Sequence, residues 1–247
     1  MTTRLESNLR ALTARIERAC EIAGRAPEEI ELVCVTKSVE PSTALELAQL
    51  GQLELGENRL QDLVRKTDFF QEHGAQVRWH FIGHLQRNKA RRAVGLAAVF
   101  HSIDSLRLID ALQRVCAEQQ RAVEVFLEVE LTGGATRSGF SPDELRAALR
   151  HVREQERLRC VGLMTLGPAP TSDVQGSARA SRAVFARLRE LRDAMDGAAF
   201  AGGRAKLSMG MTSDLEAAIA EGSDVIRVGS ALFEGVQRGG DRVGAEA

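Results

Sequence analysis

The segment Glu31-Leu32-Val33-Cys34-Val35-Thr36-Lys37-Ser38 is the part of this 247-residue chain from which the rest is best interpreted. Its five apolar or β-branched residues predict a short buried strand over 31–36, which ends directly at Lys37. Desolvation disfavours an ammonium group and makes an amine a better nucleophile toward carbonyl carbons. We therefore interpret Lys37 as a candidate Schiff-base residue; the alternative is a surface lysine turned into solvent.

The use of basic residues singles out the lysines further. Of the 33 Lys and Arg residues only four are lysines, namely Lys37, Lys66, Lys89 and Lys206. Arginine cannot form a stable imine because its guanidinium stays protonated. In so arginine-rich a chain each lysine is a candidate for a specific role, and Lys37 is the strongest because it ends a predicted strand.

Composition limits the classes of protein to consider. The apolar content of 44% and charged content of 27% are ordinary for a globular protein, and the net charge of -1 argues against nucleic acid or an anionic membrane as partner. No apolar run approaches the roughly 20 residues that span a bilayer, and the N-terminus lacks the apolar core of a signal peptide, so we expect a cytoplasmic protein. The four cysteines are widely spaced, which predicts buried thiols and no metal site.

Predicted strands and helices alternate along the chain. The helix over 5–23 comes first, and the strands follow at 31–36, 52–55, 77–82, 97–101, 122–131, 158–165, 205–209 and 224–228. The intervening helices are expected at 41–50, from 61 to about 71, and at 85–92, 106–118, 142–153, 177–195 and 215–220. Ser105 and Ser141 have the positions of helix N-caps.

Eight alternating strands and helices predict a single α/β domain over residues 1–247, folded as a (β/α)8 TIM-type barrel. The extra N-terminal helix, within residues 1–24, is expected to cap the bottom of the barrel, and residues 239–247 to form a flexible tail. An open, doubly wound sheet is the competing architecture. The absence of Gly-x-Gly-x-x-Gly after the first strand weakens its dinucleotide-binding version.

The barrel prediction places the polar residues that follow the strands at one mouth, where such barrels have their sites. Segments Leu207-Ser208-Met209-Gly210-Met211-Thr212-Ser213 and Val228-Gly229-Ser230-Ala231 follow the seventh and eighth strands. Their glycines and hydroxyls predict a phosphate cradle, although helix capping and a tight turn also account for them. Arg227, inside the last strand, needs a partner in the mouth. An amine, a phosphate cradle and an inward cation together describe a site for pyridoxal 5'-phosphate (PLP).

Seven motifs then carry a resemblance to a known family. They are Leu32-Val33-Cys34-Val35-Thr36-Lys37, Gly56-Glu57-Asn58-Arg59-Leu60-Gln61, Trp79-His80-Phe81-Ile82-Gly83-His84-Leu85-Gln86-Arg87-Asn88-Lys89, His101-Ser102-Ile103-Asp104-Ser105, Gly162-Leu163-Met164-Thr165, Leu207-Ser208-Met209-Gly210-Met211-Thr212-Ser213-Asp214 and Ile226-Arg227-Val228-Gly229. Over roughly residues 5–236 the chain resembles the YggS/PROSC-type family of PLP homeostasis proteins, which is related to the N-terminal barrel of alanine racemase.

The resemblance implies the following roles. Lys37 would carry PLP as an internal aldimine, and Arg227 would face the pyridine nitrogen. The phosphate would be held by Ser208, Thr212, Gly229 and Ser230, while Asn58, Met209 and His84 would lie around the ring. The chain departs from the family pattern at Glu130, where Asn is usual, and at Arg137, where Lys is usual. Because Arg137 cannot form an imine, the secondary PLP-exchange role of the usual lysine is in doubt here. The segment Phe233-Glu234-Gly235-Val236-Gln237 stands where the family has a Phe-Gly-x-Arg ending, so no arginine is available there.

Three functions compete at this point. The first is a non-catalytic PLP carrier or buffer that passes PLP to apo enzymes, and it is the function that we expect. The second is an amino-acid racemase, but the chain has no tyrosine to serve as the second base of its barrel relative. An arginine at the pyridine nitrogen also makes the ring a poor electron sink. The third is a cofactor-free class I aldolase using Lys37. No partner domain requires dimerisation, so we expect a monomer.

Overall fold

The computed structural model describes residues 2–133, 138–169 and 171–236. Eight parallel strands form a closed barrel in sequence order, and β1 pairs with β8 to complete it. The strands are β1 (Glu31–Val35), β2 (Glu54–Glu57), β3 (Arg78–Phe81), β4 (Val99–Ile103), β5 (Val123–Glu128), β6 (Leu158–Met164), β7 (Lys206–Ser208) and β8 (Val225–Val228). The predicted fold class is therefore confirmed. The segments 134–137 and 237–247, which include Arg137 and the expected tail, lie outside the described residues.

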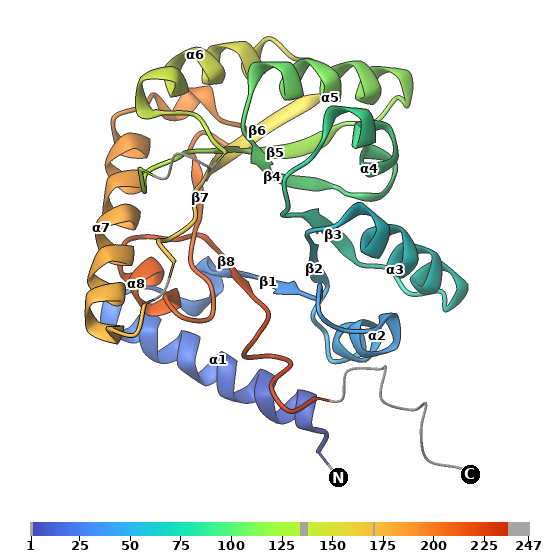
Figure 1. Ribbon diagram of the computed structural model, residues 1–247, viewed down its shortest axis with the longest axis vertical. Helices are drawn as coiled ribbons and strands as arrows, with labels where there is room; N and C mark the ends of the chain where they lie inside the picture. The colour runs from blue at the N-terminus through green and yellow to red at the C-terminus, as the bar shows by residue number, and fades with distance from the viewer. Residues whose placement is uncertain (1, 134–137, 170, 237–247) are drawn as a thin grey trace.

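Helices surround the barrel, as Figure 1 shows. They are α1 (Arg4–Ala23), α2 (Pro41–Gln49), α3 (Leu60–Glu72), α4 (Ala90–Leu96), α5 (Leu106–Glu118), α6 (Pro142–Arg153), α7 (Val174–Asp193) and α8 (Leu215–Ala220), with short 3-10 helices at Pro27–Glu29, Arg87–Lys89 and Gly197–Ala199. None of the described helices is long and apolar enough to cross a membrane.

The expectation that the first helix caps the bottom of the barrel is wrong. Helix α1 lies along the outside and packs against α8 (Figure 1). Near its start, Asn8 donates to the carbonyl oxygen of Leu232, which follows β8. Just past its end, Arg25 donates to the carbonyl oxygen of Ser223, which precedes β8. Because these contacts involve opposite ends of β8, the helix runs along the side of the barrel and does not lie across its bottom.

Two element boundaries differ from the sequence prediction for tertiary reasons. Strand β2 ends at Glu57, two residues later than expected, and it includes Gly56. Glycine is a poor strand former on its own, but a Cβ at Gly56 would lie 2.9 Å from the Val33 side chain, so the close packing of β1 and β2 favours glycine here. The helix expected at 85–92 is instead a 3-10 turn followed by α4, which starts at Ala90.

Helix capping explains part of the local agreement. Ser141 accepts from the backbone N–H of Glu144, whose carboxylate accepts from the Ser141 backbone, so the predicted N-cap forms a complete capping box. Ser105 occupies the N-cap position of α5 with extended backbone, but its side chain makes no capping hydrogen bond. It is therefore an N-cap by position alone.

The core has an outer and an inner part. The larger cluster joins the outward side chains of the strands to the helices. The smaller one lies inside the barrel and consists of inward strand residues, namely Val33, Val99, Phe126, Val161, Met164 and Val225. Since strand side chains alternate, neighbours of inward residues such as Cys34, Phe100 and Leu127 belong to the outer cluster. This alternation decides which polar residues can reach the interior or the mouth.

Candidate functional site

Lys37 lies in the turn that follows β1, and its side chain is exposed. The expectation that burial of the strand desolvates this amine is therefore wrong for this structure. The strand itself is buried from Val33 to Val35, and Thr36 is completely buried. Because all eight strands are parallel, Lys37 nevertheless stands at the same mouth as the ends of β2, β7 and β8. Lys37 therefore lies at the mouth where the sequence placed it, but its side chain is exposed and not desolvated as predicted.

The buried lysine is Lys66, on α3, whose side chain is completely buried. Its ammonium donates to the Glu57 carboxylate and, at 2.6 Å, to the carbonyl oxygen of Thr36. The Thr36 hydroxyl also donates to Glu57, over 2.5 Å. This network joins α3 to the ends of β1 and β2, directly before Lys37 and Asn58. Sequence reasoning missed it, although Leu63, Lys66 and Phe70 share the buried face of α3.

The loops after β7 and β8 meet as predicted. The Ser230 hydroxyl donates to the Thr212 hydroxyl over 2.9 Å, and the backbone N–H of Ala231 lies 3.4 Å from the same oxygen. At Gly229 a Cβ would lie 2.8 Å from the carbonyl oxygen of Val35, so β8 approaches β1 closely two residues before Lys37. The structure thus brings two hydroxyls and a glycine together beside the strand that carries Lys37, an arrangement suited to an anion.

Arg227 points into the barrel from β8 and is 4% exposed. Its guanidinium donates to the Ser208 hydroxyl and, at 3.1 Å, to the carbonyl oxygen of Thr165. Burial lowers the pKa of Arg227 to about 10, against the opposing charges of Asp214 and Glu128. The guanidinium therefore remains a cation at neutral pH, held by partners from β7 and the end of β6.

Ser208 and Met209 differ from the roles that the resemblance implied for them. The Ser208 hydroxyl is completely buried, and it contacts Arg227 and His101 instead of facing the loop that contains Thr212. Met209 is also completely buried and belongs to the outer cluster between strands and helices. Any contact of Met209 with a ligand in the mouth would come through its backbone.

Asn58 and His84 stand at the neighbouring strand ends. Asn58 is half-buried directly after β2, and a Cβ at Gly83 would lie 2.1 Å from its carbonyl oxygen, so Gly83 allows the loops after β2 and β3 to touch. His84 is exposed, with its Nδ1 atom 3.0 Å from a carboxylate oxygen of Asp104. No contact between either side chain and Lys37 is found among the described residues.

Glu128 is a buried carboxyl at the end of β5 that sequence reasoning did not assign. Burial and the nearby charge of Asp104 raise the pKa of Glu128 to about 7, and the Arg227 charge and a Ser138 hydrogen bond oppose them. The group is 6% exposed. A carboxyl that changes charge near neutral pH thus lies within electrostatic reach of Arg227.

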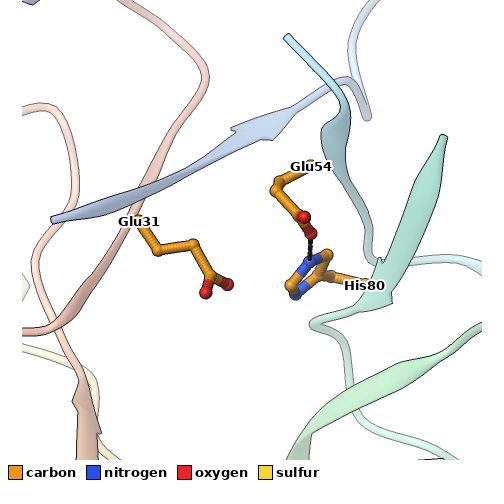
Figure 2. A group of neighbouring side chains, drawn as sticks. All are labelled: Glu31, Glu54 and His80. Atoms are coloured by element: carbon orange, nitrogen blue, oxygen red, sulfur yellow. Dashed lines mark hydrogen bonds and ion pairs between the residues drawn. The ribbon is translucent and has the colours of Figure 1, made fainter. Parts of the chain in front are cut away.

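The opposite mouth of the barrel carries a second polar group. Glu31, Glu54 and His80 place possible ligand atoms within 4.8 Å of one another, the one such group among the residues described (Figure 2). Each carboxylate already has a partner: Glu54 lies 2.5 Å from His80 Nε2, and Glu31 accepts from Lys206 over 3.1 Å. We therefore describe it as a hydrogen-bonded cluster and assign no metal to it.

The cluster continues through the barrel interior. His80 Nδ1 lies 2.8 Å from His101 Nε2, and His101 Nδ1 lies 2.8 Å from the Ser208 hydroxyl. The His101 ring also stacks on Phe126, with centroids 4.6 Å apart. Neither histidine had been assigned a role, although both occupy inward positions of predicted strands. A continuous polar path therefore joins the two mouths.

The cysteines are free and buried, as predicted. Burial raises the pKa of the Cys34 and Cys160 thiols to about 12 and that of Cys116 to about 11, and it also raises the pKa of Cys20. These thiols are therefore protonated at neutral pH and are poor nucleophiles or bases.

Comparisons with known proteins identify the family of this chain. The family model described as "Alanine racemase, N-terminal domain" matches residues 7–236. A pyridoxal phosphate homeostasis protein of Escherichia coli is 36% identical, over 92% of this chain and 94% of that protein, and one of Aquifex aeolicus is 34% identical, over 89% and 92%.

A solved structure of PipY from Synechococcus elongatus with PLP bound matches with a TM-score of 0.75 and 32% identity, over 88% of this chain and 99% of that one. An alanine racemase of Clostridium difficile, 16% identical, shares the fold, and this chain covers 56% of its length. The match to the family model and the curated relatives together show that this chain belongs to the alanine racemase N-terminal domain family, among the pyridoxal phosphate homeostasis proteins.

Proposed function

We propose that this protein binds PLP at the C-terminal mouth of the barrel and acts in PLP homeostasis, as a carrier or buffer without robust catalysis. The observation that carries the proposal is the meeting of Thr212 and Ser230 beside Gly229, where β8 packs against the strand that leads to Lys37. Relatives of similar length are named PLP homeostasis proteins, and one relative's structure contains PLP.

The residues fit this cofactor in charge and position. The hydroxyls of Thr212 and Ser230 and the backbone around Gly229 would hold the phosphate group. The exposed Lys37 amine can reach an aldehyde that enters the mouth from solvent and would supply the covalent link. Arg227 would face the pyridine nitrogen, with Ser208 holding its guanidinium. Asn58, His84 and the backbone of Met209 would border the ring.

The cofactor's aldehyde and protonatable ring supply imine formation and electron withdrawal when PLP is bound. The protein would limit the second of these, because Arg227 stays charged and gives up no proton at neutral pH. A racemase also needs a second base. The chain has no tyrosine, and its four cysteines are buried with raised pKa values. These features favour a carrier over a racemase.

His84 is the observation that favours the racemase alternative. It is an exposed histidine at this mouth, and the nearby Asp104 carboxylate can orient its ring. A racemase that uses His84 would interconvert alanine enantiomers and lose this activity in His84→Ala. The carrier proposal instead expects no racemisation above the PLP-only rate, measured by chiral chromatography.

The test of the proposed site is a titration with PLP followed by borohydride reduction and peptide mass analysis. We expect a visible absorption band that borohydride bleaches, with a pyridoxyl group on the Lys37 peptide. The Lys37→Ala variant should lose the band, whereas Lys89→Ala, which removes another exposed lysine near the mouth, should keep it. A protein that stays colourless would refute PLP binding and revive the aldolase alternative, and a label on another lysine would refute the assignment of Lys37.

Transfer and assembly complete the proposal. A carrier that is loaded with PLP should restore activity to an apo PLP enzyme. An equal concentration of the same protein without PLP should restore none. We also propose that the protein acts in the cytoplasm as a monomer. Light scattering at micromolar concentration should give the mass of one 26.9 kDa chain, and a doubled mass would contradict the monomer.

A further inference from the structure

A chain of hydrogen-bonding groups crosses the barrel from one mouth to the other. It runs from Arg227 to Ser208, then through His101 and His80, and ends at Glu54 (Figure 2 shows the last contact). Ser208 and both histidines are completely buried. The contacts after the first have donor–acceptor distances of 2.5 to 2.8 Å, so each lies within hydrogen-bonding distance.

The chemistry of the two ends fixes the direction of every bond. A guanidinium can only donate, so Ser208 accepts from Arg227, and the Ser208 hydroxyl proton is left for His101 Nδ1. His101 then carries its proton on Nε2 and donates to His80 Nδ1. At the far end an ionised carboxylate can only accept, so His80 must donate from Nε2 to Glu54. The two ends demand the same direction.

The electrostatics agree with a neutral His101 between two charged ends. Burial, with the positive charge of Arg227, holds the pKa of His101 well below its ordinary value. Burial opposes ionisation of Glu54, but the His80 hydrogen bond and the positive charges nearby hold its pKa below the ordinary value. Arg227 remains a cation. In a neutral His101 with its proton on Nε2, Nδ1 accepts from the Ser208 hydroxyl, while the Ser208 oxygen accepts from Arg227.

We infer that Glu54, His80 and His101 are positioning residues for Arg227, which act through the Ser208 hydroxyl as one directional hydrogen-bond chain. The Ser208 proton is thereby committed to His101, so Ser208 orients the cation and does not donate to phosphate. The ligand group that Arg227 faces rests on the proposed function. The direction of the hydrogen bonds does not. The bottom of the barrel thus sets the orientation of a group at the top.

The first measurement is the tautomer of each buried histidine, read from long-range 1H–15N NMR correlations of the labelled protein without added PLP. We expect His80 and His101 both to carry their proton on Nε2, with Nδ1 unprotonated, across pH 6 to 8. His80→Gln and His101→Gln assign the signals among the five histidines. An Nδ1-protonated or doubly protonated ring at either position would overturn the inferred chain.

The second measurement is the PLP dissociation constant, followed by absorbance. Loss of one hydrogen bond to a charged group should weaken binding by about tenfold or more in Ser208→Ala. His101→Phe, which keeps the stacking on Phe126, should have a similar effect although it touches neither Arg227 nor the mouth. Glu31→Gln is the matched control, because it alters the same lower cluster outside the chain, and it should change binding less than about twofold.

The outcomes separate the two hypotheses. Correct tautomers together with tenfold losses support both. Correct tautomers with unchanged binding in His101→Phe would overturn the coupling to Arg227. A wild-type protein that fails to bind PLP would refute the proposed function while the tautomers still decide the chain. Melting temperatures of Ser208→Ala and His101→Phe, compared with that of Glu31→Gln, identify a variant whose loss of binding comes from unfolding, and the tautomers of the wild-type protein then decide.

Discussion

Substitution of Lys66 by methionine tests the buried network beneath Lys37. The Lys66 ammonium and the Glu57 carboxylate are both completely buried, and one Glu57 oxygen has no partner even in the wild-type protein. Lys66→Met keeps the volume of the side chain but leaves this carboxylate without its cation. Breaking a buried pair from one side costs about 3–5 kcal/mol, because the remaining charge stays desolvated.

For a chain of this size each kcal/mol corresponds to about 2–4 °C, so we expect the melting temperature to fall by about 6–20 °C in scanning calorimetry. Lys206→Met is the matched control. Lys206 pairs with Glu31 over 3.1 Å, but the side chains are 48% and 24% exposed. Such an exposed pair contributes about 0–1 kcal/mol, or at most about 4 °C.

A second variant separates lost charge pairing from lost packing. In Lys66→Met combined with Glu57→Leu, no buried charge remains, and most of the lost stability should return. The Thr36 carbonyl oxygen still loses its 2.6 Å contact with Lys66 in both variants, so PLP binding through Lys37 should stay weaker than in the wild type. Equal melting temperatures for Lys66→Met and Lys206→Met would refute the reasoning.

Three further predictions concern titration, packing and capping. The pKa of Glu128 is raised from 4.5 to about 7, so the native state holds this proton more tightly than the unfolded state does. Raising the pH from about 4.5 to 7 should therefore remove about 3 kcal/mol of stability from the wild type. Urea unfolding of Glu128→Gln should lack this loss, and a difference from the wild type that does not depend on pH would contradict the prediction. Gly83→Ala should lower the melting temperature and weaken PLP binding, because its Cβ would lie 2.1 Å from the Asn58 carbonyl oxygen. Gly95→Ala inside α4 has no neighbour closer than 3.7 Å and should stabilise the protein by about 0.5–1 kcal/mol. Changes in melting temperature of the same sign for the two variants would contradict this prediction. Ser141→Ala should cost about 1 kcal/mol in urea unfolding through loss of the capping box, and no change would mean that the box contributes nothing in solution.

The raised pKa of Glu128 also predicts a pH dependence of PLP binding at this mouth. Near pH 7 this carboxyl exists in both charge states beside Arg227, Asp104 and Glu130. Its ionised form would place a negative charge near Arg227 and weaken the electrostatic attraction between this mouth of the barrel and an anionic ligand. PLP affinity should therefore weaken as the pH rises through 7 in the wild type more than in Glu128→Gln, which a titration at pH 6 and 8 measures.

Local chemistry was enough to predict much of the molecule. The apolar stretch before Lys37, the capping signal at Ser141 and the alternation of strands and helices predicted the closed barrel, because each depends on residues that are neighbours in the chain. The order of the strands then placed Thr212, Ser230 and Gly229 at one mouth. Helix α1 was positioned wrongly, since nothing within it indicates which surface of a barrel it will cover.

Burial of individual polar groups depended on the tertiary structure. The fold class and the approximate positions of the strands followed from the sequence alone, because periodicity and turn residues act over short distances. The folded barrel alone decided that Lys37 is exposed while Lys66 is buried, and that Ser208 faces His101 rather than the loop that contains Thr212. The reason is that solvation and hydrogen-bond partners come from strands and helices far apart in the chain, such as His101 and Ser208, 107 residues apart, which meet only when the barrel closes.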